Sequence, residues 1–154
     1  MKGIYKVKSV EETWSLARDF AKELRPGDVI CLEGDLGAGK TTFTQALAAG
    51  LQAKGRVASP TFCIVREHHC APGATAPMLV HMDLYRLSSP EDAIAIGWDD
   101  YLAKGAIIAV EWPERAGYLI PKDARHVRIL RLGEEEGEES RIIAIDTETQ
   151  NMVK

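Results

Sequence analysis

Residues 29–41, with the sequence VICLEGDLGAGKT, decide the fold of this chain. The first four are a continuous apolar run, which is typical of a strand buried on both faces of a parallel sheet. Residues 34–41 match the pattern G-x-x-x-x-G-K-[ST] at every position, and a helix is predicted to follow, from about 41 to 51. A strand, a glycine-rich loop and a helix in this order favour a phosphate-binding loop over an accidental glycine-rich turn.

The residue types of this P-loop suit phosphate chemistry. Glycines allow the backbone to turn so that successive N–H groups point at phosphate oxygens, and the following helix presents its positive N-terminal end to the same anion. We expect Lys40 to reach the β- and γ-phosphates and the Thr41 hydroxyl to bind Mg²⁺.

Two acids at strand ends are candidates for the metal and for hydrolysis. Glu111 ends the apolar run 107–110, and Asp83 ends the run 79–82. In an open α/β sheet both strand ends face the crevice where ligands bind. One acid could hold the metal, directly or through water, while the other orients the attacking water. The sequence leaves open that one of them is only a strand-end acid in solvent.

The other segments predict how the sheet is completed. Residues 9–24 have a helical apolar period, with Ser9 and Glu12 at capping-box spacing, and a short helix is expected to begin at Ser89-Pro90. Further strand-like runs are 62–67, 78–84, 106–111, 126–132 and 141–147, and 68–77 is expected to be a loop. We therefore predict a single α/β domain over 1–154. It would be a P-loop NTPase-like three-layer fold with a largely parallel central sheet, helices on both faces and a C-terminal antiparallel hairpin.

Amino-acid composition narrows the kinds of molecule that this chain is expected to bind. The 154 residues carry 19 Lys+Arg and 23 Asp+Glu, a formal net charge of −4, which argues against a basic face that binds nucleic acid directly. No apolar run approaches the ~20 residues of a membrane span, and no signal peptide is visible, so a cytoplasmic protein is expected. The stretch His68-His69-Cys70 lacks a fourth ligand in sequence, and we favour a solvated loop over a metal site there.

Motifs that are absent from the sequence narrow the class of nucleotide-binding protein to which this chain could belong. There is no N/T-K-x-D or suitably placed D-x-x-G, which disfavours a GTPase, and there is no LSGGQ. A small-molecule kinase stays possible by length, although the arginines are scattered instead of clustered as in a kinase lid.

Several blocks of the chain together resemble the bacterial TsaE family, formerly YjeE. They are GDLGAGKTTFTQAL (34–47), SPTF (59–62), HMDLYRL (81–87), Gly97 with Asp100-Tyr101, and VEWPER (110–115). The P-loop alone is generic, whereas HMDLYRL together with VEWPE is specific. The resemblance implies an ATPase that binds ATP and Mg²⁺ in threonylcarbamoyladenosine modification of tRNA. It would act with TsaB and TsaD, of which TsaD transfers the threonylcarbamoyl group to adenosine, and would meet tRNA mainly through them. Neither a membrane nor a small-molecule acceptor is expected.

The resemblance also implies roles for individual residues. Thr41 and Glu111 would hold Mg²⁺, and Asp83 would support hydrolysis as base or water-orienter, with Lys40 as the second catalytic residue. Residues 59–61 would form a switch. Trp112 would lie near the nucleotide, or alternatively would only cover the core. Residues Val10 to Thr13 would touch the adenine. The implied nucleotide-binding residues are Val10, Asp35, Leu36, Gly37, Ala38, Gly39, Lys40, Thr41, Thr42, Thr61 and Trp112.

The expected activity is that of an ATPase that is weak alone and whose nucleotide cycle resets a tRNA-modifying complex. Weakness is expected because no arginine stands at an obvious finger position, and such a residue supplied in trans adds ~10³–10⁵ in rate. Two alternatives remain: a small-molecule kinase, and a nucleotide-gated binding module in which hydrolysis is incidental.

Overall fold

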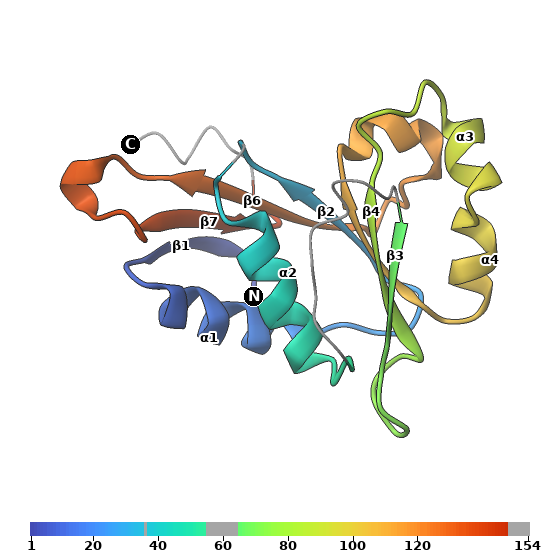
Figure 1. The fold of residues 1–154 in the computed structure, drawn as a ribbon, viewed down its shortest axis with the longest axis horizontal. Helices are drawn as coiled ribbons and strands as arrows, with labels where there is room; N and C mark the ends of the chain where they lie inside the picture. The colour runs from blue at the N-terminus through green and yellow to red at the C-terminus, as the bar shows by residue number, and fades with distance from the viewer. Residues whose placement is uncertain (36, 55–64, 148–154) are drawn as a thin grey trace.

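A seven-stranded mixed sheet forms the centre of the protein (Figure 1). The structure, a computed structural model, describes residues 1–35, 37–54 and 65–147. The strand order is β1-β7-β6-β2-β5-β4-β3. The strands are β1 (Gly3–Val7), β2 (Val29–Glu33), β3 (Val65–His69), β4 (Met78–Asp83), β5 (Ile107–Glu111), β6 (Arg125–Arg131) and β7 (Arg141–Ile145).

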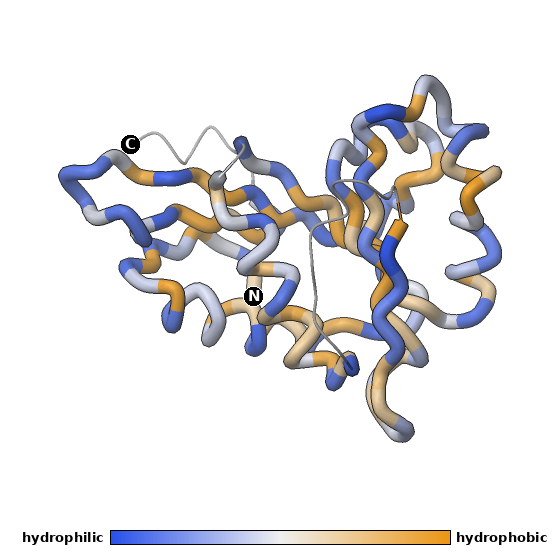
Figure 2. The backbone as a smooth tube through the Cα atoms, in the orientation of Figure 1, coloured by the Kyte–Doolittle hydropathy of each residue, from blue (hydrophilic) through white to orange (hydrophobic). Residues whose placement is uncertain are grey.

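The central strands are parallel and the outer ones antiparallel. β2 pairs in parallel with both β6 and β5, and β5 pairs in parallel with β4. β3 and β7 add antiparallel to the two sides, and β1 pairs antiparallel with β7. The predicted parallel core and C-terminal antiparallel hairpin are both confirmed. Figure 2 shows hydrophilic residues at the tip of that hairpin, beyond the ends of β6 and β7.

Helices cover both faces of the sheet. On one face lie α1 (Val10–Ala21) and α2 (Lys40–Gly50), which pack against each other. On the other lie α3 (Pro90–Ala95), α4 (Trp98–Ala103) and the 3₁₀ segment η1 (Pro113–Leu119). Alternate residues of β5 pack against the helices on opposite faces of the sheet, because successive side chains of a strand point to opposite faces. Ile107 and Ala109 join the core under α1 and α2, whereas Ile108 and Val110 join the other core.

Some predicted boundaries differ from the structure. Strand β3 continues through His68 and His69, which we expected in the loop 68–77; its pairing with β4 satisfies the backbone there. Strand β1 and helix α4 were not predicted. Within the described ranges, no helix has both the length and the apolar character needed to cross a bilayer.

Candidate functional site

The P-loop lies between the end of β2 and the start of α2, against the neighbouring strand β6. A Cβ at Gly34 would lie only 2.7 Å from the backbone oxygen of Ile129, so this position requires glycine for close approach. Gly39 is the N-cap of α2 and has φ 111°, a left-handed conformation that also favours glycine. The two glycine positions of the sequence pattern therefore have separate physical reasons: contact with the sheet at Gly34 and backbone turning at Gly39.

The first turn of α2 places polar groups at the N-terminal end of the helix. Lys40, Thr41 and Thr42 are its first three residues and are partly exposed. The amide of Phe43 donates to the oxygen of Gly39 at 2.9 Å, which begins the helical hydrogen-bond series. The first N–H groups of an α-helix have no intrahelical partner, so this end of α2 has the donor groups and partial positive charge that bind anions.

Lys40, which is partly exposed, forms a polar cluster with the buried residues Glu111 and His81 toward the carboxyl ends of the parallel strands. The Lys40 Nζ lies 3.3 Å from Glu111 Oε1, and the His81 Nε2 lies 2.8 Å from Glu111 Oε2. His81 is fully buried and Glu111 is 7% exposed. One carboxylate therefore bridges the P-loop lysine of α2 and a histidine of β4.

The electrostatic surroundings keep the Glu111 carboxylate ionised. Burial raises its pKa, but the hydrogen bond and charge of His81 and the charge of Lys40 oppose burial and prevail, so the pKa of Glu111 lies below its ordinary value. An ionised carboxylate is available to a divalent cation without first losing a proton.

Asp83 lies beside Glu111 on the neighbouring strand. The two residues are paired in the parallel register of β4 and β5, which places both acids at one edge of the sheet. The Asp83 carboxylate is half-buried, and its Oδ1 accepts the backbone N–H of Tyr85 at 3.1 Å. This contact orients the carboxylate at the strand end.

Trp112 follows Glu111 directly and belongs to an exposed aromatic group. Its φ of 57° is unusual for a residue with a side chain. The indole is 41% exposed, lies 5.2 Å from the Tyr85 ring between centroids, and has the Arg115 guanidinium 6.0 Å from its own centroid. Both expectations for Trp112, a position near the nucleotide and a role in covering the core, stay predictions.

The remaining predicted site residues are spread more widely. Asp35 and Gly37 are exposed and Ala38 is buried in the P-loop. Val10 is the first residue of α1 and is 38% exposed, on a different element from the loop. Leu36, Thr61 and the predicted switch 59–61 lie outside the described residues.

The donor atoms at this edge suit magnesium. Mg²⁺ is usually bound through one or two carboxylates together with substrate phosphates and water. Glu111, Asp83 and Thr41 carry oxygen donors of this kind on neighbouring elements. Over the described ranges, no group of three or more His, Cys, Asp or Glu side chains is arranged to hold a metal ion.

Sequence reasoning did not identify two contacts of the site. The His81–Glu111 pair joins residues thirty positions apart, and the sequence presents His81 only as the first residue of the block HMDLYRL. Arg141, which contacts the P-loop carbonyls of Gly37 and Ala38, had no sequence signal, because it follows an acidic turn far from any motif.

Comparison with known proteins gives a consistent result. Residues 7–143 match the family described as Threonylcarbamoyl adenosine biosynthesis protein TsaE. A protein of Bacillus subtilis (strain 168) named tRNA threonylcarbamoyladenosine biosynthesis protein TsaE is 40% identical over 128 residues, which cover 83% of this chain and 77% of that protein. A protein of the same name from Streptomyces coelicolor is 40% identical over 130 residues, covering 84% of this chain and 86% of the relative. The crystal structure of Bacillus subtilis YdiB superposes with a TM-score of 0.71 at 32% identity, covering 94% of this chain and 84% of the other.

Proposed function

The chain belongs to the TsaE family of threonylcarbamoyl adenosine biosynthesis proteins, and on that premise we propose that it is a magnesium-dependent ATPase. Its nucleotide cycle would reset the complex that forms threonylcarbamoyladenosine in tRNA. The observation that carries the proposal is the position of Lys40, at the first residue of α2 and 3.3 Å from Glu111, with Asp83 in register beside it.

ATP would bind with its phosphates against residues 35–42. Lys40 would exchange its present partner, Glu111, for the β- and γ-phosphates, because a triphosphate carries more negative charge than one carboxylate. That exchange would leave Glu111 and the Thr41 hydroxyl as ligands for Mg²⁺, which supplies charge neutralisation for phosphoryl transfer. Trp112, Val10 and Thr61 are proposed as further nucleotide contacts.

Asp83 would act on the attacking water. Its carboxylate accepts a hydrogen bond from the amide of Tyr85 at the strand end. It lies next to Glu111, the proposed magnesium ligand, in the register of the sheet. A carboxylate so placed can accept a hydrogen bond from water and orient it, or take its proton. Lys40 would stabilise the charge that develops on the phosphate oxygens.

The proposed partners are TsaB and TsaD, with tRNA contacted mainly through them, in the cytoplasm. The net charge of −4 supports indirect contact with tRNA, since direct binding depends on neutralising phosphates. No small-molecule acceptor is proposed.

The first experiment measures ATP binding by calorimetry for the wild type, Lys40→Ala and the control Lys104→Ala, which changes an exposed lysine at the end of α4. Lys40→Ala should abolish tight binding, because the β/γ charge loses its partner, whereas Lys104→Ala should bind like the wild type. Unchanged affinity in Lys40→Ala would contradict the phosphate-binding role.

The second experiment separates the three functional alternatives. Wild-type protein with TsaB and TsaD should release ADP steadily with no phosphorylated acceptor; a phosphorylated small molecule would indicate a kinase. Asp83→Asn should bind ATP without turnover and should fail to support repeated rounds of tRNA modification, while the exposed control Asp99→Asn should support them. Repeated modification by Asp83→Asn would show that hydrolysis is incidental and that the chain is a nucleotide-gated binding module.

The third experiment tests the metal ligand. Glu111→Ala should weaken the magnesium dependence of ATP binding in a Mg²⁺ titration. A titration identical to that of the wild type would assign the metal to Asp83.

A further inference from the structure

We propose that Arg141 is a positioning residue of the P-loop, which holds the carbonyls of Gly37 and Ala38 so that the backbone amide of Gly39 faces the phosphates. The inference rests on the proposed nucleotide binding, but its structural part can be tested without nucleotide.

The guanidinium of Arg141 makes its contacts with backbone carbonyls of two segments. Its Nε donates to the oxygen of Ala38 at 2.6 Å, and its Nη2 lies 3.4 Å from the oxygen of Gly37. Its Nη1 donates to the oxygens of Glu138 at 2.6 Å and Ser140 at 2.9 Å. One rigid, planar group therefore joins the P-loop to the tip of the β6–β7 hairpin.

Peptide geometry explains what this contact does. In a planar trans peptide the C=O and the following N–H point in opposite directions. A carbonyl of Ala38 held toward Arg141 therefore directs the amide of Gly39 away from Arg141. Gly39 is the N-cap of α2, so its amide adjoins the end of the helix that is expected to bind phosphate.

The neighbouring peptide is fixed in the same way. The carbonyl of Gly37 faces Arg141, and the amide of Ala38 on the same peptide donates to the oxygen of Asp35 at 2.9 Å. Arg141 thereby also holds the turn that closes the loop. A Cβ at Gly39 would lie 3.6 Å from Arg141 Nε, so the guanidinium packs directly beside the glycine.

Arginine suits this position better than lysine. Its guanidinium offers several N–H donors in a fixed fork, whereas lysine has one compact ammonium on a flexible stem. The positive charge of Arg141 also compensates the partial negative charge of the loop carbonyls. Without it, that negative charge would repel an anionic ligand.

Four variants test the proposal, the fourth of them, Arg141→Ala, by chemical rescue. Arg141→Met removes the donors and keeps the length, and Arg141→Lys keeps the charge with one donor centre. Arg131→Met is the matched control, because Arg131 is exposed and lies directly opposite Arg141 in the hairpin register. Each is measured for ATP affinity by calorimetry, for hydrogen exchange of the amides of 37–40 by NMR without nucleotide, and for unfolding by urea.

Arg141→Met should bind ATP about 10- to 100-fold more weakly, since hydrogen bonds from a charged donor are lost. It should also speed exchange of the Ala38 amide by at least about tenfold, because the turn that holds the bond from this amide to the Asp35 oxygen loses its support. Exchange in the β2 and β5 amides should stay unchanged, which separates a loop effect from general destabilisation. Arg141→Lys should fall between, and Arg131→Met should match the wild type. In Arg141→Ala, millimolar guanidinium should restore part of the ATP affinity, whereas ammonium should not.

Loop exchange and ATP affinity equal to those of Arg131→Met would overturn the proposal. If Arg141→Met cannot be purified folded, Arg141→Lys decides alone, and wild-type behaviour there would overturn it. If the wild type binds no ATP, the proposed function fails, and loop exchange still decides the role of Arg141.

Discussion

Gly34 shows how closely the P-loop lies against the sheet. The 2.7 Å between a Cβ built there and the Ile129 oxygen is shorter than any normal contact. Because the obstacle is backbone and not a flexible side chain, the strand or the loop must move to admit even one methyl group.

Gly34→Ala should therefore lower the free energy of unfolding by about 1–3 kcal/mol, the usual cost of overpacking. The measurement is urea unfolding followed by circular dichroism. Gly133→Ala is the control, since Gly133 has φ −65° and nothing lies within 4 Å of its Cβ position. If both substitutions lowered the free energy of unfolding by the same small amount, the loop would be shown to move aside without cost.

Cys31 is a second residue whose behaviour depends on its position in the sheet. It lies on β2 and is 1% exposed. Burial, with smaller contributions from Glu33 and Glu114, raises its pKa from 9.0 to about 12. The folded protein therefore keeps a proton between pH 9 and 12 that the unfolded chain releases, and this contribution to stability is lost as pH rises through that range.

We expect the wild type to lose about 2 kcal/mol more stability than Cys31→Ala between pH 8.5 and 10.5. Urea unfolding of both proteins at the two pH values measures the difference. Parallel losses in the two proteins would mean that the thiol ionises as easily in the folded state as in the unfolded state.

At the scale of elements, the start of α1 shows how far a local motif determines a helix. Ser9 is the N-cap, and its Oγ accepts the amide of Glu12 at 3.1 Å, as the capping-box spacing predicts. The reciprocal contact differs: Glu12 Oε2 accepts from the amide of Lys8 at 2.6 Å, one residue before the cap. The glutamate side chain therefore fixes Lys8, between β1 and α1, as well as the first turn of the helix.

Ser9→Ala should cost about 1 kcal/mol of stability, because a helix amide loses its partner. Ser9→Asp should restore most of that loss, since aspartate caps as well as serine does. Thermal unfolding of the three proteins checks the order, and an alanine variant as stable as the wild type would show that packing against α2 alone fixes the start of α1.

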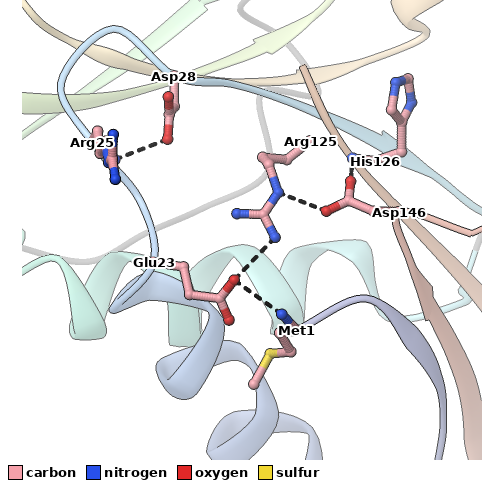
Figure 3. A network of polar contacts seen from close by, with 7 residues as sticks. All are labelled: Met1, Glu23, Arg25, Asp28, Arg125, His126 and Asp146. Atoms are coloured by element: carbon pink, nitrogen blue, oxygen red, sulfur yellow. Dashed lines mark hydrogen bonds and ion pairs between the residues drawn. The ribbon is translucent and has the colours of Figure 1, made fainter. Parts of the chain in front are cut away.

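At the scale of the whole molecule, Arg125 connects segments that are distant in sequence (Figure 3). Its Nε donates to Asp146 Oδ2 at 2.6 Å, and its Nη2 donates to Glu23 Oε1 at 3.2 Å. Glu23 also pairs with the amino terminus of Met1, and the guanidinium lies 4.8 Å from the centroid of the Phe20 ring. The network joins the region after α1 to both strands of the C-terminal hairpin.

Arg125→Met should lower the free energy of unfolding by about 1–3 kcal/mol, because it removes charged hydrogen bonds while keeping most of the packing volume. Arg128→Met on the same strand is the control, since Arg128 forms an exposed pair with Glu33 at 3.7 Å, which is worth little. Equal urea midpoints for the two variants would show that the network adds nothing beyond a surface pair.

Local patterns determined much of this protein. The apolar run of β2, the glycine-rich loop and the start of α2 follow in the predicted order, and the ends of β4 and β5 fall at Asp83 and Glu111 as expected. These features depend on spacing within a few residues, namely the periods of buried strands and helices and the conformational freedom of glycine. For this reason these features can be predicted from one sequence.

Only the tertiary structure decided which distant residues meet. The pairing of Asp83 with Glu111, the buried His81–Glu111 hydrogen bond and the contact of Arg141 with the P-loop all follow from strand order and register. Strand order is set by the packing of the whole sheet between two helical layers, to which every element contributes. No local period encodes that arrangement, so these contacts could not be derived from the sequence alone.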